Sequence, residues 1–301
     1  MPIGKAAGTR CLGSNLSHSP SITRRLGAIG PWALVLPASL ALLLLLVLPV
    51  AGTLMESFGN PKGIWENYRL FFSSSYNRAV LIRSFWIALQ ATAVSLVAGF
   101  FGAYMIANSR PGLKRVLLIV SVFPLLTGVV VRSFSWMAIL GRNGIVNTAL
   151  IQLGLIDQPL SLLFTQGAVI VGLAYLFTPL MILSLVGVLE TIEDDLYLAA
   201  ESLGASPFGV FRQVTLPLAV PGMIVGSVLV FTGSLATFVT PRLLGGEQQM
   251  TLATLLYQKA MISFDWEAAN TIAAIMMAVT ILCVFLMGWL VRRATSARAA
   301  Q

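Results

Sequence analysis

The residues of this chain that could take part in catalysis are few and far apart. There is one histidine, His18, and there are two cysteines, Cys11 and Cys283, at opposite ends of the 301-residue sequence. A single histidine excludes a His-Glu-x-x-His metalloprotease, and the separated cysteines indicate neither a thiolate metal site nor a disulfide framework. The only Gly-Lys pair, Gly4-Lys5, is not part of a phosphate-binding loop. We therefore expect no catalytic residue, no metal site and no cofactor bound by this chain.

The polar segment AAESLGASPFGVFRQVTLPLAVPG, residues 199–222, lies between two apolar runs and begins with the pattern of a short helix. Leu196, Ala199, Ala200 and Leu203 recur at the spacing of one helical face. Gly204 follows, and a glycine can adopt the left-handed conformation that ends a helix. The pattern predicts a short helix that stops at Gly204.

A second helix should follow directly after this bend. Ser206-Pro207 provides an N-cap and a first-turn proline, and Leu216-Pro217 is expected to begin the next apolar helix. From periodicity alone, two interpretations remain open. The segment could be a helix that lies on the membrane surface, or a docking element for a soluble partner.

The spacing of the segment resembles the cytoplasmic signature loop of ABC importer permeases, which is Glu-Ala-Ala, three residues, Gly, nine residues, an aliphatic residue, any residue, then Leu-Pro. Here the matching residues are Leu198-Ala199-Ala200, Gly204 and Val214-Thr215-Leu216-Pro217. Leu198 replaces the first glutamate of the family, and Glu201, one turn later, could make the acidic contact instead. The resemblance implies an ATPase-coupling surface formed by Leu198, Ala199, Ala200, Glu201, Gly204, Ala205, Phe208, Arg212, Leu216 and Pro217.

Three further segments resemble the spermidine/putrescine-type branch of that family. They are VRSFSWMAILGRNGIVN from Val131, YLFTPLMILSLVGVLETI from Tyr175 and FVTPRLLGG from Phe238. The branch implies a permease subunit for a polyamine or related amino compound, and an opine-like or organic-anion solute is the alternative. It also implies a cytosolic ATPase dimer that binds ATP and Mg, a second, related permease chain, and an external solute-binding protein.

The elements that must position these residues are membrane helices. Hydrophobic residues make up 57% of the chain and charged residues only 10%, with a mean hydropathy of +0.88, which is outside the range of soluble domains. Backbone groups in hydrocarbon must be paired within their own segment, so each apolar run should be a helix. We expect an all-α protein with six transmembrane helices, of type I ABC importer permease-like fold, at about residues 32–55, 79–107, 116–140, 166–189, 216–239 and 268–291.

Basic residues indicate the orientation of these helices. They cluster before the first run, between the second and third, and after the sixth, at Lys5, Arg10, Arg24, Arg25, Arg110, Lys114, Arg115, Arg292, Arg293 and Arg298. The positive-inside rule then places both termini and the loop at about residues 190–217 in the cytoplasm of a bacterium, with the chain in the inner membrane. Because the clusters separate apolar runs, the net charge of +8 does not indicate nucleic-acid binding.

The domain organisation follows from the same runs. We expect a flexible cytoplasmic tail at residues 1–31, a permease domain at 32–291 and a cytoplasmic tail at 292–301. The loops at about residues 56–78, 141–165 and 240–267 should face outward, and they are long enough to form short helices.

Two arginines, Arg83 and Arg132, fall within the apolar runs, and both could extend to the outer headgroups. Arg132 precedes Trp136 on a helix that could line the solute path, where an arginine without a carboxylate partner would favour a solute with an anionic group. Because the runs contain no Asp or Glu, a proton-coupled secondary transporter is disfavoured. A structural membrane subunit remains open. The candidate path residues are Arg132, Trp136, Tyr175, Phe177 and Phe238.

Overall fold

The computed structural model describes residues 31–61 and 63–299, and the predicted tail at residues 1–31 lies almost wholly outside them. The described residues form helices, turns and loops without strands. In chain order the helices are α1 (Pro31–Ser57), α2 (Glu66–Ser73), α3 (Ser75–Ala107), α4 (Pro111–Leu126), α5 (Val129–Leu140), α6 (Ile145–Gln152), α7 (Gln166–Leu189), α8 (Asp194–Ser202), α9 (Pro207–Val210), α10 (Leu216–Ala236), α11 (Val239–Gly245), α12 (Leu252–Tyr257) and α13 (Trp266–Ala299). The predicted all-α fold class is confirmed.

The chain divides into two units, with residues up to Gly52 in the first and residues from Thr53 in the second. The described part of the first unit is most of α1, which is exposed from Val35 to Val50. The window Val35–Ser57 has a mean hydropathy of 2.4. An isolated helix with so apolar a surface needs lipid or another protein around it.

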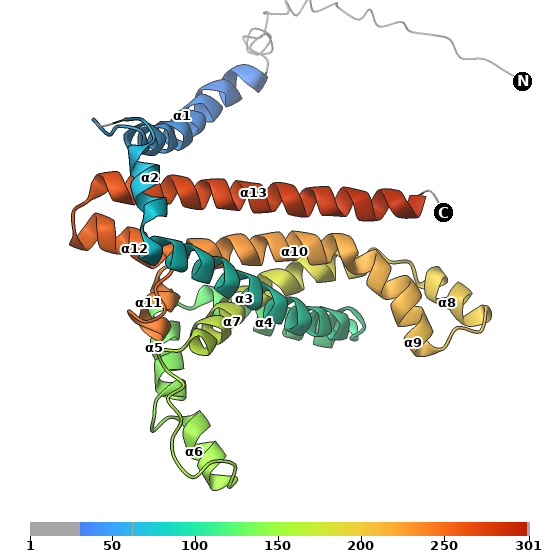
Figure 1. Ribbon diagram of the computed structural model, residues 1–301. Coiled ribbons are helices and arrows are strands. Elements are labelled where there is room, and N and C mark those ends of the chain that lie inside the picture. The colour runs from blue at the N-terminus through green and yellow to red at the C-terminus, as the bar shows by residue number, and fades with distance from the viewer. Residues whose placement is uncertain (1–30, 62, 300–301) are drawn as a thin grey trace, which may run out of the picture. The chain divides into compact units, whose positions relative to one another are not determined.

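The second unit is built around three long helices, α3, α7 and α10, which pack along one another (Figure 1). Met181 on α7 is fully buried between Gly99 on α3 and Gly226 on α10. A Cβ atom at either glycine would collide with the Met181 side chain. Small residues thus permit the close helix approach that is typical of membrane proteins, where packing replaces the hydrophobic effect between helices.

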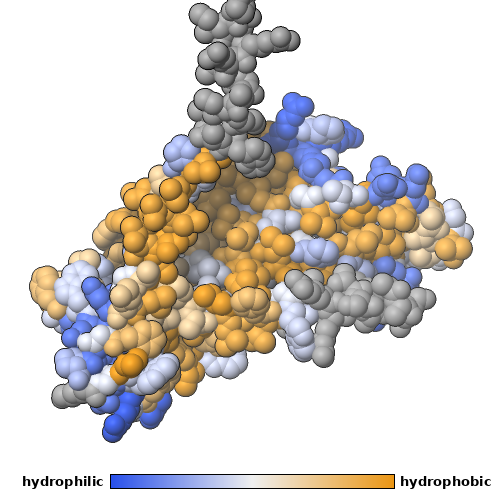
Figure 2. Space-filling view, turned by 90° about the horizontal axis from the view of Figure 1, so that it is seen from above, coloured by the Kyte–Doolittle hydropathy of each residue, from blue (hydrophilic) through white to orange (hydrophobic). Residues whose placement is uncertain are grey.

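Within residues 31–61 and 63–299, five helical segments are long and apolar enough to cross a membrane, and a bent pair of helices makes up to six. Apolar side chains cover most of the surface visible in Figure 2, and hydrophilic residues gather towards its edges. This arrangement is suited to a bilayer, because the apolar surface can face hydrocarbon. The predicted number of spans is confirmed, and the bent pair corresponds to the predicted third span.

The prediction of one continuous helix at residues 116–140 is wrong. Instead α4 ends at Leu126, α5 begins at Val129, and the two segments are bent by 97°. In an unbroken helix the Pro124 carbonyl would accept the N–H of Gly128. The Thr127 hydroxyl donates to that carbonyl at 2.8 Å, and glycine is a poor helix former. Both effects favour a break at Thr127-Gly128.

The α-helix α10 begins at Leu216, as predicted, but the expected break between it and the preceding helix is absent. The helix continues without interruption from Pro207 to Ala236, through a π-helical turn at Phe211–Thr215. A proline inside an α-helix would clash with the carbonyl four residues earlier. In the wider turn the N–H of Leu216 donates to the carbonyl of Phe211, five residues back, and this local widening accommodates Pro217.

Short helices occur in the loops where they were predicted: α2, α6, α11 and α12. Within the second unit, α2, α11 and α12 lie at one end and α8 and α9 at the other (Figure 1). That these two ends face opposite sides of the membrane stays a prediction. At the C-terminus, α13 continues to Ala299, beyond Val291, where the last span was predicted to end.

Candidate functional site

The predicted helix, bend and helix of the signature loop are present as α8, Gly204 and α9. Gly204 has a φ of +81°, in the left-handed region that favours glycine. The N–H of Ala205 donates to the carbonyl of Ala200 at 3.1 Å, and the N–H of Gly204 donates to the carbonyl of Glu201 at 2.9 Å. These two bonds are those of a Schellman motif, which pairs the last carbonyls of a helix. The bend is therefore a defined structure.

The start of α9 also follows the sequence signals. The Ser206 hydroxyl accepts a hydrogen bond from the N–H of Gly209 at 3.2 Å, and Pro207 occupies the first turn. An N-cap of this kind contributes about 1 kcal/mol to helix stability. Since both sides of the bend are capped, α8 and α9 hold a fixed local geometry.

The signature loop presents apolar side chains to its surroundings. Every residue of α8 is exposed or half-buried. Leu198 is 59% exposed, Leu203 is 89% exposed and Phe208 is 71% exposed. Large exposed apolar side chains are typical of a binding surface. Of the other predicted coupling residues, Ala199, Glu201, Gly204 and Arg212 are exposed, and Ala200, Ala205, Leu216 and Pro217 are half-buried.

An aromatic column connects this loop to the helical bundle. The ring of Phe208 stacks on that of Phe211 with centroids 6.5 Å apart. Phe211 in turn contacts Phe100 at 5.8 Å and Tyr104 at 5.7 Å, both edge to face and both on α3. Edge-to-face pairs of this kind stabilise packing beyond the area that they bury. A movement of Phe208 can therefore be transmitted to α3 through these packed rings.

An ion pair lies beside the same loop. The Lys114 Nζ at the start of α4 is 2.8 Å from Glu190 Oε1 at the end of α7. The two side chains help to line a polar pocket of about 260 Å³ that also includes Tyr104, Asp194 and Tyr197. The pocket brings the chain segment between α3 and α4 next to the base of α8.

Three of the predicted path residues, Arg132, Trp136 and Tyr175, lie near one another in the structure. Trp136 on α5 and Tyr175 on α7 meet edge to face with centroids 5.5 Å apart, and both line an apolar groove of about 350 Å³. Arg132 lies one helical turn before Trp136. It does not extend to solvent, because it is only 8% exposed and its Nη2 donates to the carbonyl of Thr127 at 2.9 Å.

The two remaining path candidates lie elsewhere. The ring of Phe177 packs against Gly233 on α10, within the core. Phe238 stacks on Tyr257 with centroids 4.9 Å apart and an interplanar angle of 11°. Tyr175 and Phe177 are two positions apart in sequence, and residues two apart on a helix point in different directions. The five candidates therefore do not form one cluster.

Sequence reasoning missed a pair of buried hydroxyls next to Arg132. Ser133 Oγ and Thr240 Oγ1 are 3.4 Å apart, and the contact joins α5 to α11. Both residues occur in the quoted segments VRSFSW and FVTPRL, but their pairing depends on tertiary structure and has no signal in local sequence.

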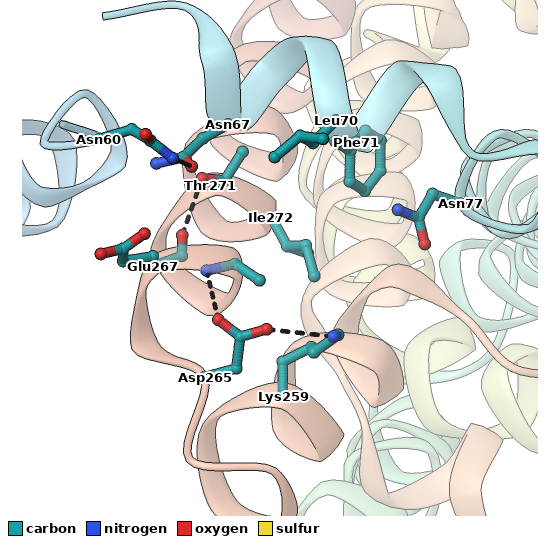
Figure 3. Close-up of a pocket in the computed structure, with 11 residues that line it drawn as sticks. Asn60, Asn67, Leu70, Phe71, Asn77, Lys259, Asp265, Glu267, Thr271 and Ile272 are labelled. Carbon is teal, nitrogen blue, oxygen red and sulfur yellow. Dashed lines mark hydrogen bonds and ion pairs between the residues drawn. The ribbon is translucent and has the colours of Figure 1, made fainter. Parts of the chain in front are cut away.

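A second polar pocket, of about 280 Å³, was not predicted at all. It lies among α2, the start of α3 and the start of α13 (Figure 3). Asp265 Oδ2 accepts a hydrogen bond from Lys259 Nζ at 3.1 Å, and its Oδ1 accepts the N–H of Ala268 at 3.2 Å. Nearby, Asn60 Nδ2 donates to Asn67 Oδ1 at 2.7 Å. These residues come from loops far apart in sequence.

Comparison with known proteins gives consistent results. A family profile described as "Binding-protein-dependent transport system inner membrane component" matches residues 95–296. The spermidine/putrescine transport system permease protein PotB of Haemophilus influenzae is 33% identical over 224 residues, which cover 73% of this chain and 77% of PotB. PotB of Escherichia coli K12 is 31% identical over 201 residues, which cover 67% of this chain and 73% of PotB.

Solved structures show the same fold. A bacterial alginate ABC transporter, crystallised in complex with an alginate pentasaccharide-bound periplasmic protein, contains a chain that matches with a TM-score of 0.77 at 18% identity. The match covers 91% of the present chain and 98% of the other. At this identity the likeness concerns the fold alone, and it confirms the predicted importer-permease architecture.

Proposed function

The chain belongs to the family of binding-protein-dependent transport system inner membrane components, as a multi-pass permease of the bacterial inner membrane, and from this premise we propose how it works. We propose that it forms part of the solute path of an ATP-driven importer and that the loop of α8 and α9 is the docking site of a cytosolic ATPase. ATP and Mg are bound by that partner, and this chain is not itself catalytic.

One observation carries this proposal. A capped, well-defined bend carries three exposed apolar side chains, Leu198, Leu203 and Phe208, although burying such side chains stabilises a protein by about 1.5–3 kcal/mol each. A helix that merely rested on lipid would not need a fixed bend or an aromatic column into the bundle. Both features are expected of an element that receives a partner and transmits its movement.

The remaining components follow from the family. A second, related permease chain completes the path. An external solute-binding protein docks at the end that carries α2, α11 and α12. Both termini face the cytoplasm, on the opposite side. In this proposal Trp136 and Tyr175 line the path, Phe177 and Phe238 lie farther along it, and Arg132 lies one turn before Trp136 on α5. The polar pocket beside Asp265 lies at the end where the solute-binding protein is proposed to dock.

For the solute, the similarity to PotB supports a polyamine or a related amino compound. An opine-like or organic-anion solute, which the resemblance to this branch also allows, is the second candidate. Uptake of labelled spermidine in proteoliposomes, with unlabelled putrescine or an organic anion as competitor, separates the two. Competition by the anion alone would replace the polyamine assignment.

The docking site is tested by Ala200→Asp. Ala200 is half-buried on α8, so the change should leave the membrane fold intact while it places an unpaired carboxylate against an apolar partner surface, which is costly. In mild detergent the wild-type chain should co-purify with an ATPase and a second permease, identified by mass spectrometry, and the variant should lose the ATPase alone.

Ala149→Asp on α6 serves as the matched control, because it is the same change on a short helix away from the proposed docking site. It should retain the ATPase. Stoichiometric recovery of the ATPase with Ala200→Asp, together with normal uptake, would show that this loop is not the coupling element.

A further inference from the structure

The break in the third span leaves carbonyl groups that need donors. Where α4 ends, its last carbonyls no longer meet the N–H groups of a following turn. The Thr127 hydroxyl pairs with the carbonyl of Pro124. The carbonyl of Thr127 itself lies beyond the helix, in an extended residue with ψ of 142°. An unpaired carbonyl in a membrane protein costs several kcal/mol, so this group must find a partner.

Arg132 supplies that partner. Its Nη2 donates to the carbonyl of Thr127 at 2.9 Å, while its backbone N–H donates to the carbonyl of Gly128 at 3.1 Å. One residue thus bonds to both residues of the break. Its positive charge also lies next to the C-terminal end of α4, where the helix dipole favours a cation.

The guanidinium is more than nine-tenths buried and is bonded through only one of its three nitrogens. Nε and Nη1 have no hydrogen-bond partner within residues 31–61 and 63–299. The apolar groove lined by Trp136 and Tyr175 does not have Arg132 among its lining residues. The contact that the side chain does make is the one across the break.

The residues that follow Arg132 explain why the angle of the break matters. Ser133 meets Thr240 on α11, and Trp136, one turn along α5, meets Tyr175 on α7. Both contacts depend on α5 leaving α4 in one direction. A change in the bend would move Trp136 away from Tyr175 and open or close the apolar groove between them.

We propose that Arg132 is a positioning residue, which clamps the bend between α4 and α5 and thereby places Trp136 against Tyr175 whatever solute is carried. This inference rests on the proposed role of the chain as a permease. Because the clamp uses a single donor, a lysine should be able to replace it, whereas a site that required bidentate pairing would not tolerate lysine.

The test compares Arg132→Lys, Arg132→Gln and Arg132→Met with Arg83→Met. Arg83 is the matched control because its Nη1 also donates to a backbone carbonyl, that of Gln248, at 2.9 Å, but from an exposed position. Spin labels at Ile119→Cys on α4 and Ile145→Cys on α6, both exposed positions, report the bend by electron–electron distance measurement. Cys11 and Cys283 are first replaced by serine.

In the purified complex, we expect Arg132→Lys and Arg83→Met to keep the wild-type distance distribution. Arg132→Met should shift or broaden it, and should lower the maximal uptake rate by about tenfold, the effect expected of one lost charge-assisted hydrogen bond. The half-saturating solute concentration should stay unchanged. The distance distribution and uptake rate of Arg132→Gln should lie between those of Arg132→Lys and Arg132→Met. If Arg132→Met fails to assemble, Arg132→Gln takes its place in the test.

An unchanged distance distribution in both Arg132→Met and Arg132→Gln would overturn the proposal. So would a variant that raises only the half-saturating concentration, since that result identifies Arg132 as a solute contact. The distance measurement needs no transport. A wild-type complex that transports nothing would therefore contradict the proposed function while the clamp could still be judged.

Discussion

The two ends of the second unit are built from similar parts that are packed in opposite ways. At one end, α2, α11 and α12 are short helices whose apolar residues Phe71, Leu244 and Leu252 are almost completely buried. At the other end, α8 is equally short but contributes no fully buried residue, and Leu203 beside it is 89% exposed. Short helices are stable only when something covers their apolar face. At the first end, other parts of the chain cover the apolar faces of the short helices. The apolar face of α8 must be covered by something outside the chain.

Hydrogen bonding shows the same difference. At the packed end, the side chains of Thr251 and Thr254 form a capping box, the N–H of Leu252 donates to Ser84 Oγ at 2.7 Å, and Tyr76 donates to the sulfur of Met250 at 3.0 Å. In the loop of α8 and α9, the bonds that define the bend are local, within three to five residues. The packed end is thus part of the fold, and the α8 end is a preformed surface attached to it.

The largest effect should come from Gly204→Val. A β-branched residue at φ of +81° costs roughly 1–2 kcal/mol in local strain and should distort the bend. We expect the variant to insert in the membrane but to lose the ATPase, and with it solute uptake, as judged by co-purification and by proteoliposome assay. Gly154→Val is the matched control, because Gly154 has a φ of +68° and open space around its Cα, as Gly204 does. Loss of the ATPase in both variants would remove the distinction between the two ends.

The next largest effect should be a difference in the loss of stability between a substitution at one end and a substitution at the other. Leu252→Ala removes a side chain of zero exposure and should lower the free energy of unfolding by about 2–5 kcal/mol. Leu203→Ala should change that free energy by less than about 0.5 kcal/mol and weaken only the binding of the ATPase. Thermal unfolding in detergent and titration with the purified ATPase measure the two quantities. A large loss of stability in Leu203→Ala would mean that α8 is packed after all.

The smallest effects should come from breaking two ion pairs, one chosen from each end. Lys114→Ala breaks the pair with Glu190, and Lys259→Ala breaks the pair with Asp265, and in both pairs the side chains are partly exposed. Each change should alter the free energy of unfolding by no more than about 1 kcal/mol. A difference of several kcal/mol between them would indicate that charge, and not apolar packing, distinguishes the ends.

The features that the sequence predicted well are those decided by neighbouring residues. Gly204 and Ser206-Pro207 determine the bend through bonds that span only a few positions, so their pattern is visible without the rest of the fold. The two errors concern hydrogen bonds that compete within a helix. Hydropathy is the same whether residues 116–140 form one helix or two. It does not reveal that the Thr127 hydroxyl bonds to the Pro124 carbonyl, which would accept the N–H of Gly128 in an unbroken helix.

Tertiary placement explains what else was missed. The burial of Arg132 depends on where α5 turns, and the separation of Phe177 from Tyr175 depends on which neighbours surround α7. The polar pocket beside Asp265 joins loops that are almost 200 positions apart in sequence. Whether Arg132, Trp136 and Tyr175 contact solute stays a prediction.

The π-helical turn at Phe211–Thr215 has a consequence for how this loop could be altered by insertion or deletion. A wider turn holds one residue more than an α-helical turn would, and each residue of an α-helix advances the face by about 100°. Deleting one residue from this turn should rotate the phase of α9 relative to α10, so that Phe211, with Phe208 stacked on it, would no longer meet Phe100 and Tyr104. The direction of the docking loop is therefore set by the residue count at one point, separately from the faces that α10 presents to the bundle.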